Sequence, residues 1–217
     1  GELLLRHAHG ELGASIAMVI SNHDTLAPLV GQFGIPFHVV SHQGLTREAH
    51  EAQMLEQLRG QDLDYLVLAK YMRILSKDFI GQYQDRIINI HHSFLPAFTG
   101  SHPYRQAFER GVKIIGATAH FVTEVLDEGP IIAQEAVVIE ESDTLESLEA
   151  KMHAVEHRLY PAVLQKIAEG KLTSSRFTTE AYRLTEQAYI LRLRTPACLE
   201  GSDEYDKVDK TDTIHVF

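Results

Sequence analysis

Residues 87–96 of this 217-residue chain read IINIHHSFLP. The first five, Ile87–His91, are rich in β-branched and apolar residues, and a turn around Pro96 ends the run, so we expect a buried strand followed by a turn. Side chains two apart on a strand point to the same side, which places Asn89 and His91 on one face. The stretch therefore predicts both a core strand and a position for polar chemistry at its carboxyl end.

Short β-rich runs alternate with helix-length segments between residues 15 and 142. The predicted strands are Ile16–Ile20, Phe37–Val40, Tyr65–Ala69, Ile87–His91, Ile114–Val122 and Ile131–Ile139. The predicted helices are Thr25–Phe33, Thr46–Arg59, Ser76–Tyr83 and Pro103–Arg110. This alternation predicts an α/β fold with a doubly wound, mostly parallel sheet.

The apolar pattern takes on a helical period from Thr144 to Glu169, which indicates a helix that packs one stripe against a core. Asp143 is the predicted N-cap of this helix, and Gly170 stands where a glycine commonly ends one. Pro161 lies inside the segment and predicts a kink or a break into two consecutive helices.

The sequence divides into a predicted catalytic domain at 1–172 and a C-terminal extension at 173–217 that is partly helical or disordered. Within the extension, residues 178–194 have the pattern of an amphipathic helix, and residues 199–213 are acidic and polar. The final residues, Thr213–Phe217, are expected to add a short strand at an edge of the sheet.

The bulk composition excludes several classes of protein. A net charge of −10 argues against binding nucleic acid through a basic surface and against anionic membranes, and no apolar run reaches the roughly 18 residues of a membrane span. Cys198 is the single cysteine, which excludes an internal disulfide and a cysteine-rich zinc site. We expect a cytoplasmic protein without a metal site, and a homo-oligomer stays open.

Three side chains suit acyl chemistry on a one-carbon unit. Asn89 can donate to a carbonyl oxygen that becomes an oxyanion, and His91 can donate to the same oxygen or protonate a leaving nitrogen. Asp127 can orient or deprotonate water or an amine. Taken singly, each also fits a structural role, since Asp127–Gly129 resembles an ordinary acidic turn. The presence of His120 in the same short span favours a reaction centre.

The block Ile87–Gln134, IINIHHSFLPAFTGSHPYRQAFERGVKIIGATAHFVTEVLDEGPIIAQ, closely resembles the 10-formyltetrahydrofolate-dependent formyl-transfer superfamily. Leu66–Ser76, LVLAKYMRILS, resembles it too. The resemblance implies a formyltransferase-like fold of the Rossmann type. The superfamily's catalytic Asn, His and Asp fall on Asn89, His91 and Asp127.

The resemblance also implies where the folate lies. The pterin is expected against the segment after the third predicted strand and the loop after the fifth, held largely by main-chain groups. The substrate-binding residues implied in this way are Met72, Arg73, Ile74, Leu75, His120, Val122 and Gly129. No cofactor with its own reactive chemistry is expected, because the folate is the substrate.

Two activities compete within the superfamily. His92, Phe94 and the run Gly116–His120 resemble formyltetrahydrofolate deformylases, which release formate for purine biosynthesis and balance one-carbon pools. Phosphoribosylglycinamide formyltransferases usually have Pro in place of His92, yet Glu156–Pro161 resembles their C-terminal helix. The catalytic block favours hydrolysis of 10-formyltetrahydrofolate to formate and tetrahydrofolate. The alternatives are formyl transfer to glycinamide ribonucleotide and an inactive folate-binding fragment.

The beginning of the chain departs from the superfamily's pattern. The superfamily's sheet starts with a strand and a loop ahead of its first helix, whereas Gly1–Glu11 resembles that helix itself. The first strand, and the ACT-like regulatory domain of deformylases, have no counterpart in this sequence. We therefore expect a central position of the sheet to be empty.

Overall fold

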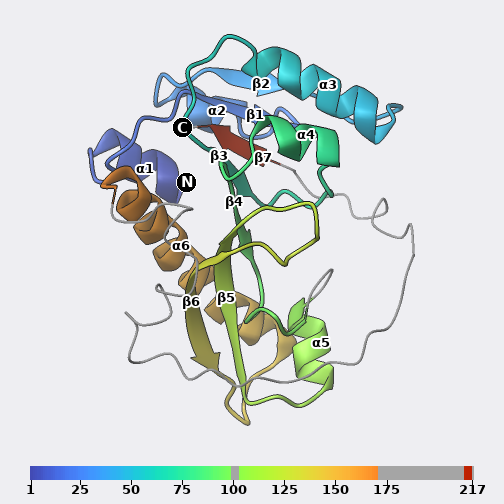
Figure 1. The fold of residues 1–217 in the computed structure, drawn as a ribbon. Helices are drawn as coiled ribbons and strands as arrows, with labels where there is room; N and C mark the ends of the chain where they lie inside the picture. The colour runs from blue at the N-terminus through green and yellow to red at the C-terminus, as the bar shows by residue number, and fades with distance from the viewer. Residues whose placement is uncertain (99–102, 171–212, 217) are drawn as a thin grey trace.

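The structure is a computed structural model that describes residues 1–98 and 103–170, together with the backbone of 213–216 (Figure 1). Its elements run in the order α1 Glu2–Ala8, β1 Met18–Ser21, α2 Ala27–Gly31, β2 Phe37–Val39, α3 Arg47–Leu58, β3 Leu66–Ala69, α4 Lys77–Gln82, β4 Ile87–His91, α5 Pro103–Glu109, β5 Ile114–Phe121, β6 Ile131–Val138, α6 Leu145–Ala168 and β7 Thr213–Val216. The predicted alternation of strands and helices is confirmed, and β4 has the predicted bounds. The predicted helix at 178–194 lies outside the described residues.

The strands form one sheet in the order β2-β1-β7-β3-β4-β5-β6. Of these described strands, β1, β2, β3, β4 and β6 run in one direction, while β5 and β7 run against them. The sheet is therefore mostly parallel in strand direction, as predicted, but mixed in its pairing. Among the described strands, β1–β2 and β3–β4 are the pairs that run parallel.

The position that we expected to be empty is filled by β7. This strand pairs antiparallel with β1 through Met18 and Val216, and with β3 through Leu66 and the same residue. Two expectations are therefore wrong: the sheet has no central gap, and residues 213–216 form a central strand rather than an edge strand. The reason is that a gap between β1 and β3 would leave two rows of backbone N–H and C=O groups unpaired, and β7 satisfies both.

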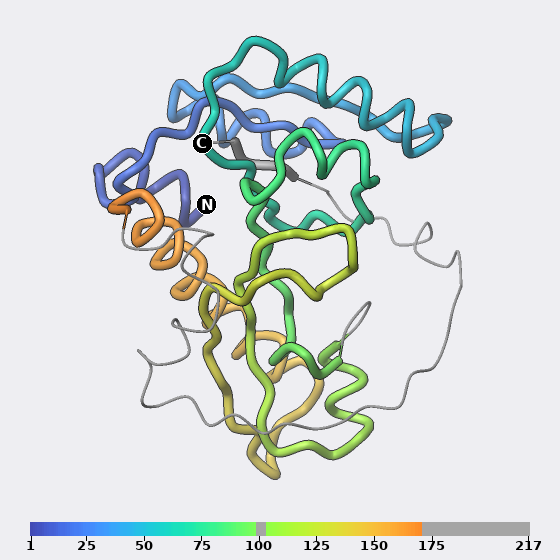
Figure 2. Tube along the Cα trace, in the orientation of Figure 1, coloured from blue at the N-terminus to red at the C-terminus, as the bar shows by residue number. Residues whose placement is uncertain are grey.

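Alternation along the strands sends side chains into two core layers. Val67 and Ile88 pack with α1 and α6 in one layer. Leu66 and Ile87, one residue earlier on β3 and β4, pack with α3 and α4 in the other layer. Helices thus cover both faces of the sheet (Figure 1), which confirms the doubly wound architecture. On the first face α1 lies beside α6 (Figure 2).

Helix α6 differs from the prediction at its start and in its middle. Its N-cap is Thr144 rather than Asp143, because Thr144 and Ser147 exchange side-chain and backbone hydrogen bonds in a capping box. Pro161 does not divide the segment, which is a single 24-residue helix. Buried apolar residues lie on both sides of Pro161, and their packing offsets the roughly 3 kcal/mol that a proline costs inside a helix. The predicted glycine end is confirmed, since Gly170 has a positive φ of 67°.

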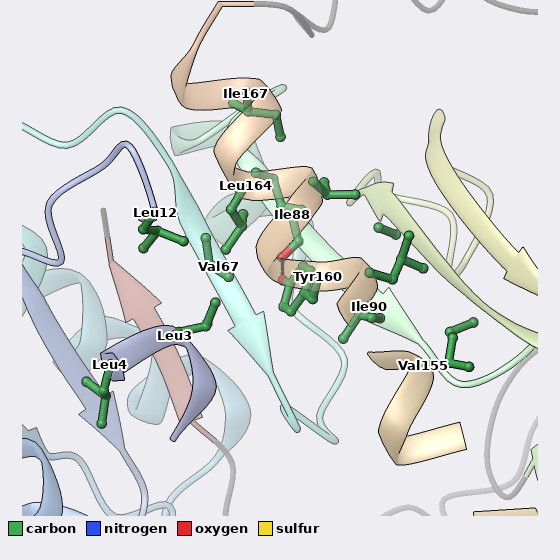
Figure 3. Close-up of a cluster of buried hydrophobic side chains, with 14 of the residues drawn as sticks. Leu3, Leu4, Leu12, Val67, Ile88, Ile90, Val155, Tyr160, Leu164 and Ile167 are labelled. Carbon is green, nitrogen blue, oxygen red and sulfur yellow. Dashed lines mark hydrogen bonds between the residues drawn. The ribbon is translucent and has the colours of Figure 1, made fainter. Parts of the chain in front are cut away.

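Tyr160 links α6 to the strands β3 and β4 by hydrogen bonds. Its buried hydroxyl lies 2.8 Å from the Leu68 carbonyl oxygen. The same hydroxyl lies 2.9 Å from the carbonyl oxygen of Ile88 (Figure 3). The Tyr160 O–H is thus shared between carbonyl oxygens of the neighbouring strands β3 and β4, close to the carboxyl ends of both strands. Burial raises the pKa of Tyr160 well above its usual value, so the hydroxyl keeps its proton and remains a donor.

We predict that Tyr160→Phe lowers the free energy of unfolding by about 1–3 kcal/mol, because two buried carbonyl groups lose their donor while the ring still fills its space. Urea denaturation followed by circular dichroism measures the change. Tyr83→Phe is the control, since no hydrogen bond of the Tyr83 hydroxyl is found among the described residues. Equal stability of both variants and the wild type would contradict the role of Tyr160.

Candidate active site

A pocket opens at the carboxyl ends of β3 and β4. Asn89 and His91 project into it from β4, on the face opposite to Ile88 and Ile90, which are buried against α6. The segment that follows β3 and the loop that follows β5 form the opposite walls. The predicted residues that line this pocket are Asn89, His91, Asp127, Met72, Arg73, Ile74, Leu75, His120 and Val122. The structure thus brings together nine of the ten.

His91 is held by one ring nitrogen and faces Asp127 with the other. Its Nε2 lies 3.1 Å from the Phe98 carbonyl oxygen, which can only accept, so Nε2 carries a hydrogen. Its Nδ1 lies 3.6 Å from Oδ2 of Asp127. Burial lowers the pKa of His91 and outweighs the opposing charge of Asp127. The ring is therefore largely neutral near pH 7, with Nδ1 available to take up a proton.

His120 supports Asn89 more directly than it supports Asp127. Its Nδ1 donates to the Phe121 carbonyl oxygen at 2.9 Å, so its Nε2 is the acceptor for the Asn89 amide at 3.3 Å. Asp127 Oδ1 lies further away, 3.9 Å from Nε2. Asn89 on β4 and His120 on β5 are directly opposite each other in the sheet. This bond fixes the orientation of the Asn89 amide and leaves its second N–H for a ligand.

Asp127 reaches the pocket through an unusual backbone conformation. Its φ is +58°, a left-handed value that Asp tolerates better than most residues, and its side chain is only 5% exposed. Gly129, two residues on, does not line the pocket. A Cβ there would stand 1.7 Å from the Phe121 carbonyl oxygen, so this glycine lets the turn lie against the end of β5.

A buried hydrogen-bond network holds the loop after β4. The Thr118 hydroxyl donates to the Ser93 carbonyl oxygen at 2.7 Å and accepts from the Leu95 amide at 3.1 Å. Gln134 on β6 donates to the Leu95 carbonyl oxygen at 2.8 Å. Gln134 was missed in the sequence because a glutamine on a half-buried strand gives no signal of its partner.

A second missed residue, Glu51, holds the segment that carries Met72–Leu75. Glu51 is buried on α3, and its carboxylate accepts from the Ser76 backbone amide at 2.8 Å and from the Ser76 hydroxyl. Ser76 is also the N-cap of α4. This double acceptor fixes the point at which the segment turns into α4. A charged residue on a helix is usually solvated, so the sequence alone did not indicate this role.

Residues 1–98 and 103–170 contain no cluster of three His, Cys, Asp or Glu residues placed to bind a metal ion. The helices of this described part of the chain are also too short or too polar to cross a bilayer.

Comparison with known proteins places the chain in a family. The model of the formyl transferase family matches residues 1–164, so the chain belongs to the formyl transferase family. Its solved neighbours include a formyltetrahydrofolate deformylase from Pseudomonas syringae, with a TM-score of 0.75 and 41% identity over 78% of this chain and 57% of that one. A phosphoribosylglycinamide formyltransferase from Bacillus halodurans has a TM-score of 0.74 and 41% identity over 79% of this chain and 90% of that one.

Curated relatives that are similar to this chain include several formyltetrahydrofolate deformylases. Formyltetrahydrofolate deformylase of Escherichia coli is 50% identical over 167 residues, which cover 77% of this chain and 60% of the relative. The deformylase of Bacillus subtilis is 50% identical over 147 residues, or 68% of this chain and 49% of the relative. The chain therefore spans between about half and three fifths of the length of these relatives.

We predict that the protein loses stability in acid from about pH 6.5 downward. Burial lowers the pKa of both His91 and His120 below the usual 6.5. Between the lowered value and 6.5 the unfolded chain binds more protons than the folded one, so the free energy of unfolding falls as pH falls through that window. Urea denaturation at a series of pH values measures the slope. His120→Gln should reduce it, and an unchanged slope would show that His120 does not contribute.

We also predict that Gly129→Ala destabilises the protein and displaces Asp127, because the added Cβ meets the Phe121 carbonyl oxygen at 1.7 Å. Thermal melting should show a cost of about 1–3 kcal/mol, typical of overpacking. The matched control is Gly81→Ala in α4, where the new Cβ meets nothing within 4 Å and where alanine favours a helix. A Gly129 variant as stable as the control would contradict this account.

Proposed function

We propose that the chain hydrolyses the N10-formyl group of 10-formyltetrahydrofolate to formate and tetrahydrofolate. The observation that carries the proposal is the convergence of Asn89, His91 and Asp127 on one pocket, beside the segment Met72–Leu75. The names of the curated relatives support hydrolysis over transfer. We further propose that the folate is the only small molecule required, without a separate cofactor, and that the protein acts in the cytoplasm.

The formyl group has a defined place in this scheme. Its carbonyl oxygen lies against the second N–H of the Asn89 amide, whose first N–H is bound to His120. This donor is oriented before the substrate arrives, so it stabilises the developing oxyanion without rearrangement. The pterin lies against Met72–Leu75 and the loop from Val122 to Asp127, with their main-chain groups as partners.

Asp127 holds the attacking water, and His91 accepts a proton from it and later donates that proton. Water held by the Asp127 carboxylate attacks the formyl carbon and gives up a proton to His91 Nδ1, which lies 3.6 Å from Asp127 Oδ2. When the bond between the formyl carbon and N10 breaks, its electron pair goes to N10, which takes from His91 the proton that came from water. The lowered pKa of His91 favours this transfer, since a weakly basic imidazole releases its proton readily.

Formyl transfer to glycinamide ribonucleotide is the second candidate function. It is favoured by the structural similarity to the transferase from Bacillus halodurans, of which 90% is covered. In that reaction an amine takes the place of water at the same carbon. A third reading, an inactive folate-binding fragment, predicts binding without turnover.

The deciding experiment incubates the purified chain with 10-formyltetrahydrofolate, with and without glycinamide ribonucleotide. We expect formate release without the acceptor. Strict dependence on the acceptor would instead establish the transferase, and folate binding without either product would establish the inactive fragment.

Asp127→Asn tests the assigned chemistry, because a neutral amide neither holds the attacking water as a carboxylate does nor stabilises the proton that His91 Nδ1, 3.6 Å from Asp127 Oδ2, takes up. We expect formate release to fall by about 10²–10⁴-fold while folate binding, measured by calorimetry, is largely kept. Asp64→Asn, at an exposed position before β3, is the matched control. Full activity of the Asp127 variant would exclude the role proposed for this carboxylate.

A further inference from the structure

A buried charged cluster lies directly behind the pocket wall beside His91. His92 lines the pocket and points its Nδ1 at Oε1 of Glu156 on α6, 2.5 Å away. The Tyr104 hydroxyl on α5 donates to the same oxygen at 2.9 Å. Neither Tyr104 nor Glu156 lines the pocket. Three elements thus meet at one carboxylate oxygen, and His92 is the member that faces the ligand.

The carboxylate of this cluster is ionised. Burial raises the pKa of Glu156, but the hydrogen bond and charge of His92, together with the Tyr104 hydroxyl, outweigh burial and bring the pKa below its usual value. The side chain of Glu156 is only 8% exposed. A buried carboxylate requires such partners, so removing His92 would leave an ionised acceptor facing the pocket.

His92 lines a part of the pocket outside the two segments that we propose to bind the folate. The folate-binding segments account for the walls formed by Met72–Leu75 and Val122–Asp127. The pocket is also lined by His92, which follows His91 in the chain, and by Pro103, the first residue of α5. We assign these two residues to the acceptor side of the pocket, past which a nucleophile other than Asp127-bound water would enter.

The cluster also joins two features that pointed to different activities in the sequence. His92 belongs to the deformylase-like block, where transferases usually have proline, and Glu156 belongs to the transferase-like helix. A proline has no side-chain donor, so a carboxylate at the Glu156 position would then stay available to an amine. In this chain His92 occupies that carboxylate instead.

We propose that the His92–Glu156–Tyr104 cluster determines the nucleophile: it closes the acceptor side of the pocket and keeps Glu156 from binding an ammonium group, so that water alone reaches the formyl carbon. His92 and Tyr104 are positioning residues in this proposal. The inference rests on the proposed hydrolysis and adds the reason for its selectivity.

The test is the partition of the formyl group between water and a small primary amine, with glycinamide as the probe. In aminolysis the amine nitrogen bonds to the formyl carbon, the bond to N10 breaks, and N10 takes up the proton that the amine loses. Mass spectrometry counts formate and N-formylglycinamide. We expect wild type to give formate with only a trace of N-formylglycinamide. We expect His92→Ala to raise the ratio of N-formylglycinamide to formate about tenfold or more, the size of one charged hydrogen bond.

Two further variants separate positioning from general damage. His92→Asn keeps a donor toward Glu156 and should restore the wild-type ratio, while His92→Ala combined with Glu156→Gln should lose the gain. Glu135→Gln is the matched control, because Glu135 also pairs with a residue of α6, Arg158, away from the pocket. It should leave the product ratio unchanged.

The outcomes distinguish this inference from the function on which it rests. If wild type releases no formate, the proposed function fails. If wild type hydrolyses the substrate and His92→Ala gives an unchanged product ratio, the inference alone is overturned. Should His92→Ala not fold, Tyr104→Phe decides: it removes one of two hydrogen bonds to Glu156 and keeps the ring, so a smaller rise supports the inference and an unchanged ratio overturns it.

Discussion

The rest of the molecule depends on one constraint, the burial of β4 on both of its faces. Ile88 and Ile90 lie in the layer under α6, and Ile87 lies in the layer under α3 and α4. A shift of one residue would exchange these faces, at a cost of several buried apolar side chains. The register is therefore fixed, and Asn89 and His91 have no alternative but to face the pocket.

Most of the fold and the centre of the site could be predicted because they depend on local patterns. The strand Ile87–His91 combines β-branched residues with a turn, and its period of two places Asn89 beside His91 without any knowledge of the fold. Asp127 was identified first by the chemistry of its carboxylate and then by resemblance, and the structure brings its Oδ2 to 3.6 Å from His91. The strand and the three site residues could be predicted because residues adjacent in the sequence, or a known motif, determine them.

What could not be predicted depends on partners far apart in the chain. Glu156 meets His92 across 64 positions, and Glu51 caps a segment 25 positions later. In the sequence each is an ordinary charged residue on a helix. Pro161 was misjudged for a related reason, since the local cost of a proline was visible and the packing that offsets it was not. Thr144 displaced Asp143 as the N-cap through a reciprocal bond with Ser147.

The central strand β7 has a consequence for how this protein folds. Met18 pairs with Val216, so the middle of the sheet joins residues from opposite ends of the described chain. Contacts of such long sequence separation form late, because a large loop must close before any of them is gained. During synthesis the pairing of β7 with β1 and β3 can form only after residues 213–216 have emerged. Chaperone demand and aggregation of nascent chains are therefore properties to examine in this protein.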